Sequence, residues 1–393
     1  MAESRPKSGR AKAEPGPAQS ATVARSALQQ LHCQHLQQME LCTCSVQLGA
    51  AADGTLGLLH RCTNLTSLII NSHIFDTPAG AVVDSLSSLV HLQHLRLRPV
   101  AGRWTVTVRP DDQPVGGLSH ATLPSLQRLT LLDVNALSME NLLQLGALTC
   151  LQELRLWTAG DVVVGPGSVP GLVFPASLKT LVLSSPVEAG ILSLVPAKLQ
   201  ALRIRNRLEG PVEGPVSLLS CMARLQHLTE LSVQPSNHVN WPDPGCAYSA
   251  LTASTQLVNL DICITKGPHG MWPYVFPSAR VLPQLNSVIL MHSADDEPDV
   301  AMLSPRMGAA DLSSLVNCCP NLHDIANLPM QSGLHVSELR KLTALENLSL
   351  SYDFEAADSC DESVRGLATL TQLHHLDVGL ESQQNSVWVF CCR

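Results

Sequence analysis

The chain has 393 residues and a net charge of -8, with 15% charged and only 3% aromatic residues. Its 65 leucines are spread along the whole chain, which argues against a disordered polymer and leaves no apolar run of the roughly 18 residues that a membrane helix needs. Single hydrophobic cores rarely grow beyond about 250 to 300 residues. The length therefore indicates either several domains or a repeat architecture.

The charge is distributed unevenly. Residues 1–207 carry 17 Lys and Arg against 13 Asp and Glu, whereas residues 208–393 carry 8 against 20. The two halves therefore favour partners of opposite charge. Nineteen of the 25 basic residues are Arg, a residue suited to fixed carboxylate or phosphate contacts, although a GC-rich coding sequence is an equally good explanation.

The composition of the N-terminus and the cysteine count indicate a cytoplasmic protein. Residues 1–30 are rich in Pro, Ala, Ser and Gly and are predicted to form a flexible tail. Residues 1–20 contain no apolar segment of a secretory signal, and the 13 cysteines are an odd number, so we expect reduced thiols. The cytoskeleton or the cilium is an alternative location, and an organellar targeting segment is a weaker alternative.

A leucine motif recurs through residues 31–380. The pattern Leu-x-x-aliphatic-x-aliphatic begins at Leu36, Leu65, Leu92, Leu126, Leu151, Leu178, Leu199, Leu228, Leu257, Leu285, Leu345 and Leu373, with a degenerate copy at Leu322. The starts are on average about 28 residues apart, and seven copies have another leucine three residues earlier. This regularity predicts about 13 structural repeats.

Each repeat combines a strand half with a helical half. The segments 95–97 and 154–156 alternate with period two, as strands do, whereas Leu142, Leu145 and Leu148 have the spacing of one helix face. One strand and one helix in about 28 residues cannot enclose a core alone. Neighbouring repeats must therefore stack.

The chain resembles the leucine-rich-repeat family of the long intracellular type, in segments such as LVHLQHLRLRP (89–99), LTCLQELRLWT (148–158), LTALENLSLS (342–351) and LTQLHHLDVG (370–379). The resemblance implies an α/β fold: a curved, horseshoe-shaped solenoid over residues 31–380, with a parallel sheet on the concave side and helices on the convex side. It also implies protein binding rather than catalysis.

The chain departs from the family pattern in its turns and at its C-terminus. The family's Asn or Cys at the ninth repeat position is matched only by Cys44, so other groups must supply the turn hydrogen bonds. Residues 381–393 are predicted to be a C-terminal tail. They end in SVWVFCCR without an evident polar cap, so an incomplete gene model or a splice variant is plausible at this end.

The candidate site is the concave sheet face, where residues that flank the apolar strand positions project. These positions gather six arginines and one tryptophan, residue types enriched in binding hot spots: Arg96, Arg98, Arg128, Arg155, Trp157, Arg203 and Arg205. They predict an interface for an acidic protein segment. A solvated face is the alternative. Further along, the face becomes acidic with Glu230, Asp261, Asp324 and Asp377.

Two further clusters of residues, one aromatic and one of cysteines, allow other interpretations of the function. The aromatic residues Trp241, Tyr248, Trp272, Tyr274 and Phe276 either contact a ligand or, slightly better supported, hold two loops together. The cysteines from Cys33 to Cys62 raise a thiol or zinc-dependent activity as an alternative, although their spacing fits zinc ligation poorly.

These observations favour a non-catalytic scaffold or adaptor, with no cofactor, metal or catalytic residue. The alternatives are substrate recognition for a ubiquitin ligase, although residues 1–35 lack a helical pattern like an F-box, and a structural role in the cytoskeleton or cilium. Nucleic acid is not expected as a partner, because the second half is acidic and lysine is scarce. A membrane is not expected either.

Overall fold

The computed structural model describes residues 35–43, 59, 61–72, 86, 88–99, 126–134, 143–156, 171–184, 189–205, 215–234, 245–263, 270–291, 305–330, 336–353, 367, 370–381 and 386–392. The chain divides into two compact units, Met1–Leu129 and Thr130–Arg393, which we call unit 1 and unit 2. Each unit repeats the same strand-and-turn structure and is described by itself.

Unit 1 contains three parallel strands that neighbour one another in chain order: β1 (Gln38–Thr43), β2 (Ser67–Ser72) and β3 (His94–Pro99). Leu68 on β2 pairs in register with Leu95 on β3, and both side chains are fully buried. Register pairing of equivalent leucines aligns the repeats, because a slip of one residue would turn every leucine to the other face.

The strands of unit 2 also follow chain order: β4 (Leu131–Val134), β5 (Glu153–Leu156), β6 (Thr180–Leu183), β7 (Ala201–Ile204), β8 (Glu230–Val233), β9 (Asn259–Cys263), β10 (Ser287–Met291), β11 (Asp324–Met330), β12 (Asn347–Asp353), β13 (His375–Glu381) and β14 (Ser386–Cys392). All neighbouring pairs from β4 to β13 are parallel. The sheet of unit 2 is therefore built by stacking one strand from each repeat.

The last strand differs from the sequence expectation of a tail at 381–393. Residues Ser386–Cys392 form β14, which pairs antiparallel with β13 along its whole length. The segment SVWVFCC is rich in β-branched and aromatic residues, which favour strands. β14 covers the hydrogen-bonding edge that β13 would otherwise expose.

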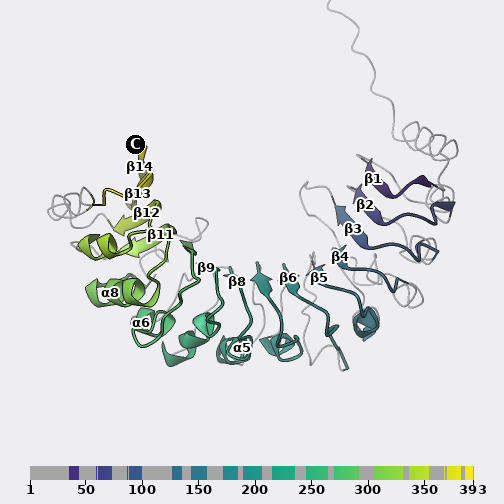
Figure 1. Ribbon diagram of the computed structural model, residues 1–393, viewed down its shortest axis with the longest axis horizontal. Helices are drawn as coiled ribbons and strands as arrows, with labels where there is room; N and C mark the ends of the chain where they lie inside the picture. Colours follow the sequence, from purple (N-terminus) through teal and green to yellow (C-terminus); the bar gives the residue numbers. More distant parts are fainter. Residues whose placement is uncertain are drawn as a thin grey trace, which may run out of the picture. The chain divides into compact units, whose positions relative to one another are not determined.

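The helices of unit 2 are short and lie on one side of its sheet (Figure 1). They are η4 (Leu145–Ala147), η5 (Ala189–Ser193), α5 (Pro215–Met222), η6 (Gly245–Thr252), α6 (Trp272–Val275), α8 (Ala309–Cys318) and η7 (Val336–Lys341). Among the described helices, none has the length and apolarity to cross a membrane.

Tandem turns explain why leucines recur at intervals of three before each strand. The backbone N–H of Leu148 donates to the carbonyl of Leu145, and that of Leu151 donates to the carbonyl of Leu148, each over 3.0 Å. All three side chains are fully buried. A turn that closes after three residues brings every third side chain to the same side, so three leucines line the core before the strand begins.

Backbone carbonyls lock each repeat to the next one. Gln152 and Glu153 both donate their N–H groups to the carbonyl of Thr130, over 2.8 and 2.9 Å. The following repeat uses the same arrangement, in which Lys179 and Thr180 donate to the carbonyl of Gln152. This shared acceptor fixes the point at which each parallel strand pair starts.

Side chains also donate hydrogen bonds to backbone carbonyls of the turns between strands. Ser254 donates to the carbonyl of Leu228 over 2.7 Å, and Arg280 donates to the carbonyl of Thr252 over 2.8 Å. Arg224 donates to the carbonyl of Ser193 over 2.5 Å. Two basic residues of this acidic half, Arg224 and Arg280, therefore stabilise the solenoid itself.

The register at β4 differs from the sequence prediction by three residues. The predicted repeat start at Leu126 would bury Leu131, but the structure buries Leu132, which pairs with Leu154 on β5. Leu131 is only half-buried. The sequence allows either register, because Leu131 and Leu132 are adjacent. The hydrogen bond from the N–H of Leu129 to the carbonyl of Leu126 and the pairing of β4 with β5 select the register in which Leu132 is buried. As a result, Arg128 lies in the turn before β4 and not on the strand.

Candidate protein-interaction surface

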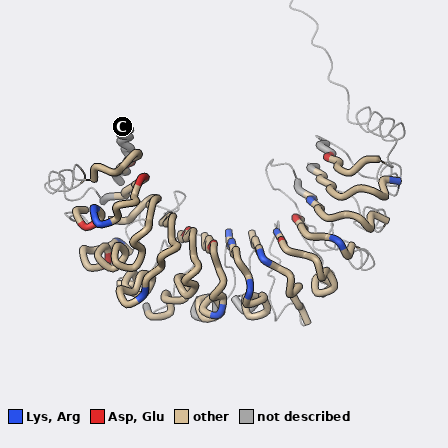
Figure 2. The backbone as a smooth tube through the Cα atoms, in the orientation of Figure 1, with Lys and Arg blue, Asp and Glu red and all other residues tan. Residues whose placement is uncertain are grey.

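The open face is our name for the side of the unit 2 sheet that faces away from its helices. The buried side of each strand is aliphatic, as in β5, where Leu154 and Leu156 are buried and Glu153 and Arg155 are half-buried. The open face of β5 to β9 carries Glu153, Arg155, Thr180, Val182, Ala201, Arg203, Glu230, Ser232, Asn259 and Asp261. Charged residues are sparse along the described part of the chain trace (Figure 2).

Arg155 is paired with an acidic residue of its own strand. Its Nε donates to Oε1 of Glu153 over 2.5 Å, because residues two apart in a strand point to the same side. Its register partner on β4 is the fully buried Asp133. The positive charge of Arg155 therefore lies among carboxylates.

Arg203 is paired across strands. Its Nε and Nη2 donate to the two carboxylate oxygens of Glu230 on β8, the second over 3.0 Å. This hydrogen bonding to Glu230 raises the pKa of Arg203, and the negative charges of Glu230, Glu153 and Asp261 add to the effect, while burial opposes it. The guanidinium is held in one orientation, and its charge is compensated.

Arg205 is the exception among the arginines of this face. It is exposed and directly follows β7, where its backbone N–H donates to the carbonyl of Leu183 over 2.8 Å. Its side chain forms no hydrogen bond or ion pair with the described residues. The carboxyl end of β7 thus presents a cation that this part of the chain does not neutralise.

Toward β13 the open face becomes acidic. Asp261 accepts hydrogen bonds at Oδ2 from Ser232 Oγ (2.9 Å) and from Gln234 Nε2 (2.7 Å). Asn347 donates to Asp324 on the neighbouring strand β11. The described open-face positions of β9 to β13 contain no Lys or Arg.

The predicted site residues fall in both units. Arg155, Arg203 and Arg205 share the open face of unit 2, whereas Arg96 is half-buried on β3 of unit 1. Arg128 lies at the end of unit 1, in a turn. The side chain of Arg98 and the whole of Trp157 lie outside the described residues.

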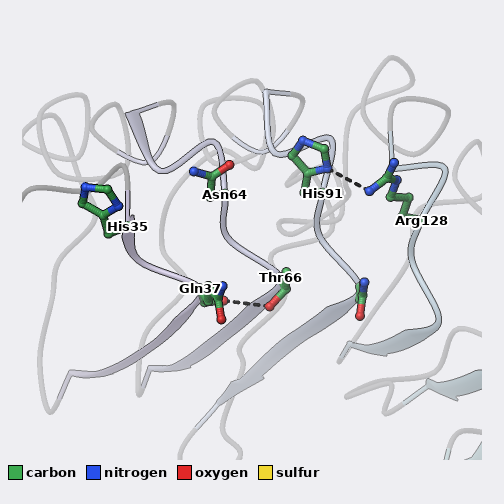
Figure 3. Close-up of a pocket in the computed structure, with 7 residues that line it drawn as sticks. His35, Gln37, Asn64, Thr66, His91 and Arg128 are labelled. Atoms are coloured by element: carbon green, nitrogen blue, oxygen red, sulfur yellow. Dashed lines mark hydrogen bonds between the residues drawn. The ribbon is translucent and has the colours of Figure 1, made fainter.

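A polar pocket in unit 1 was missed by the sequence reasoning. It is an open depression of ≈ 300 Å³ lined by His35, Gln37, Asn64, Thr66, His91, Gln93 and Arg128 (Figure 3). Its residues flank the leucines that lead into β1, β2, β3 and β4. Alignment of the repeats on that leucine would have shown the cluster, but only with the correct register at Leu129.

No protein-family model and no curated protein matches the chain. Two solved structures have a similar chain trace. A leucine-rich-repeat protein of Leptospira interrogans is 14% identical, with 91% of this chain and 98% of that chain covered and a TM-score of 0.31. TLR13 in its complex with ssRNA13 is 16% identical, with 89% of this chain and 52% of that chain covered and a TM-score of 0.46.

The geometry of the repeats identifies the fold. In both units short hydrogen-bonded turns, lined mostly by buried leucines, lead into short parallel strands that follow chain order. This is the architecture that the sequence motif predicts. The chain is a leucine-rich-repeat solenoid.

Three of the five aromatic residues, Tyr248, Trp272 and Phe276, belong to the core of the leucine-rich-repeat solenoid. Trp272 and Phe276 are buried and stack with ring centroids 6.3 Å apart, and Trp272 Nε1 donates to the carbonyl of Pro305 over 2.8 Å. Tyr248 is fully buried, whereas Tyr274 is 45% exposed. Trp241 lies outside the described residues. The hydrogen bond from Trp272 links α6 to the segment before α8, while the expectation that the rings hold two loops together stays a prediction.

The cysteines of the solenoid show no metal site in the described part. No group of three or more His, Cys, Asp or Glu side chains is placed to hold a metal ion there. Cys62 is buried, and the side chains of Cys33, Cys42 and Cys44 lie outside the described residues.

Cys318 and Cys319 form a buried vicinal pair. Hydrogen bonding between the two side chains lowers the pKa of Cys318, an effect that burial opposes. The same hydrogen bond, together with burial, raises the pKa of the Cys319 thiol.

Proposed function

We propose that this solenoid is a non-catalytic protein-interaction scaffold or adaptor that holds an acidic segment of a partner protein on its open face. The observation that carries the proposal is the pair of arginines at the end of β7. The guanidinium of Arg203 is fixed by Glu230, while Arg205, two residues further on the same side, is exposed and unpaired among the described residues. One fixed and one available guanidinium make a suitable anchor for a carboxylate.

Preorganisation supports binding at this place. A side chain already held in one geometry loses little conformational freedom when a partner docks, so more of the contact energy appears as affinity. Arginine is also enriched among the residues that dominate binding energy. The Glu153–Arg155 and Arg203–Glu230 pairs are both ordered before a partner arrives.

The ion pairs also reduce the net positive charge of the open face. On β5 to β8, Arg155, Arg203 and Arg205 face Glu153 and Glu230, so the charges nearly balance. Attraction to an acidic segment is therefore concentrated at the carboxyl end of β7. Trp157, Arg96 and Arg98 stay predicted contributors to partner binding, whereas Arg128 lines the pocket of unit 1 and is not part of this anchor.

Charge reversal with a matched control tests the proposal. The full-length protein, Arg205→Glu and Arg340→Glu are used to capture partners from a cell extract, and the captured proteins are quantified by mass spectrometry. Arg340 is exposed on η7, on the helix side, so it provides the same substitution away from the open face. We expect Arg205→Glu to lose specific partners that Arg340→Glu retains, with both variants melting like the wild type by circular dichroism. Equal capture by all three proteins would show that the open face around Arg205 is not the site.

A further inference from the structure

The pocket of unit 1 arises from one position of the repeat. The residue directly before the leucine that leads into each strand is His35, Asn64, His91 and Arg128 in four successive repeats. Figure 3 shows these side chains in a row, with Gln37 and Thr66 in a second row below them. Strands of a sheet lie about 4.8 Å apart, so equivalent residues of adjacent repeats come together in one depression of ≈ 300 Å³.

A hydrogen bond between Arg128 and His91 determines which N–H groups of the two side chains remain for a ligand. Arg128 Nη1 donates to His91 Nδ1 over 3.0 Å. A guanidinium can only donate, so Nδ1 accepts and the ring proton of neutral His91 lies on Nε2. The remaining N–H groups of Arg128 have no partner among the described residues. Both side chains therefore offer N–H donors.

In three repeats of unit 2, the residue before the leucine that leads into the strand donates a hydrogen bond to backbone of the preceding repeat. There Ser177 donates to the carbonyl of Leu151 (2.7 Å), and Asn321 donates to the carbonyl of Pro283 (2.8 Å). Gln372 likewise donates to a backbone carbonyl of the preceding repeat. These side chains stabilise the stack of repeats, whereas Arg128 contacts a side chain of the same row. The Arg128–His91 contact thus differs from the hydrogen bonds to backbone made at this position by Ser177, Asn321 and Gln372.

The pocket favours negative charge. None of its seven lining residues is acidic, and Arg128 carries a full positive charge. Among the described residues of unit 1, Glu40 is the single acidic residue, against Arg61, Arg96, Arg98 and Arg128. The guanidinium of Arg128 and the imidazoles of His35 and His91 already offer more N–H donors than the two oxygens of one carboxylate require.

We propose that this pocket binds a phosphate monoester carried by a phosphorylated side chain of a partner protein. Such a group has three strong acceptor oxygens and a charge of about -1.5 to -2 near neutral pH, which matches a site with one arginine and several N–H donors. The site lies within unit 1 and uses none of the open-face residues of unit 2. The proposal therefore stands or falls independently of the function proposed above.

Peptide binding to the full-length protein tests this site. The probes are fluorescein-labelled peptide mixtures of degenerate sequence with a central phosphoserine, a central serine or a central glutamate, together with a labelled single-stranded oligonucleotide. Binding is followed by fluorescence anisotropy, with inorganic phosphate as competitor. The variants are Arg128→Gln and His35→Ala, and the matched control is Arg61→Gln, an exposed arginine of unit 1 that does not line the pocket.

We expect the phosphoserine mixture to bind at least about tenfold more tightly than the serine and glutamate mixtures, and inorganic phosphate to compete. Arg128→Gln should weaken this binding by at least about tenfold, because it removes a charge-assisted hydrogen-bond donor, whereas Arg61→Gln should leave it unchanged. His35→Ala, at an exposed position, should weaken binding while the melting curve stays unchanged.

Three results would overturn the proposal. The first is equal binding of the phosphoserine mixture by wild type and Arg128→Gln. The second is equal, Arg128-dependent binding of the glutamate mixture, which would identify a carboxylate site. The third is tighter, Arg128-dependent binding of the oligonucleotide, which would identify a nucleic-acid site.

Discussion

The guanidinium of Arg203 on β7 is held by both carboxylate oxygens of Glu230 on the adjacent strand β8. Residues that lie 27 positions apart in the chain are thereby joined into one fixed pair on the open face. The pair orders the surface while reducing its net positive charge.

We predict a measurable coupling between these two residues. A double-mutant cycle of Arg203→Ala and Glu230→Ala, followed by urea unfolding, should give a coupling free energy of about 1 kcal/mol, at the upper end for ion pairs because the contact is bidentate and half-buried. Raising the salt concentration should reduce it. The more exposed Lys341–Glu338 pair should give no more than about 0.5 kcal/mol. Equal coupling in the two cycles would contradict the assignment of a preorganised pair.

Adjacent leucines provide a test of the β4 register. Leu132→Ala should lower the free energy of unfolding by about 2 to 5 kcal/mol, because the side chain is fully buried and its removal leaves a cavity. Leu131→Ala should cost less than about 1 kcal/mol, since Leu131 is half-buried on the open face. Chemical unfolding of both variants measures the difference. The opposite order would favour the register in which the repeat begins at Leu126.

The aromatic cluster should behave as core. Trp272→Ala should destabilise the solenoid by about 3 to 5 kcal/mol, because it removes a buried ring stacked on Phe276 and the hydrogen bond to the Pro305 carbonyl. Tyr274→Ala, at an exposed position two residues away, should change stability by less than about 0.5 kcal/mol. Thermal melts by circular dichroism compare them. A Trp272→Ala variant as stable as the wild type would favour the alternative interpretation, in which these rings contact a ligand.

Thiol accessibility should separate the cysteines into two groups. Cys150 and Cys246 are exposed and should react with iodoacetamide in the native protein, whereas Cys318 and Cys319 are buried and should react only after unfolding in urea. Hydrogen bonding lowers the pKa of Cys318, but a reagent that cannot reach the sulfur gains nothing from a more acidic thiol. Mass spectrometry of alkylated peptides gives the order of reaction. Rapid native labelling of Cys318 would show that the end of α8 opens.

Much of the fold could be predicted from leucine spacing. Intervals of three before each strand match hydrogen-bonded turns, and intervals of two within each strand match its alternation, as in Leu145, Leu148, Leu151, Leu154 and Leu156. These intervals encode local geometry, so they can be recognised without knowing what lies beside them. The parallel, chain-order sheet then follows, because a single repeat cannot bury its own leucines.

The candidate site depended on information that leucine spacing does not carry. The pairing of Arg203 with Glu230, and the contact of Arg128 with His91 across 37 residues, arise from the register of whole repeats. One ambiguous register, at Leu131 and Leu132, moved Arg128 from a strand to a turn.

The sequence by itself determined the repeat, its leucine core and the chain order of the strands, because burial of aliphatic side chains leaves a periodic trace in the chain. Only the tertiary structure decided which charges neutralise one another, that Ser386–Cys392 close the sheet edge as β14, and that four successive repeats build one polar pocket. Those outcomes depend on side chains from separate repeats meeting in space. Such contacts leave no periodic trace, since each partner alone is compatible with a solvated surface.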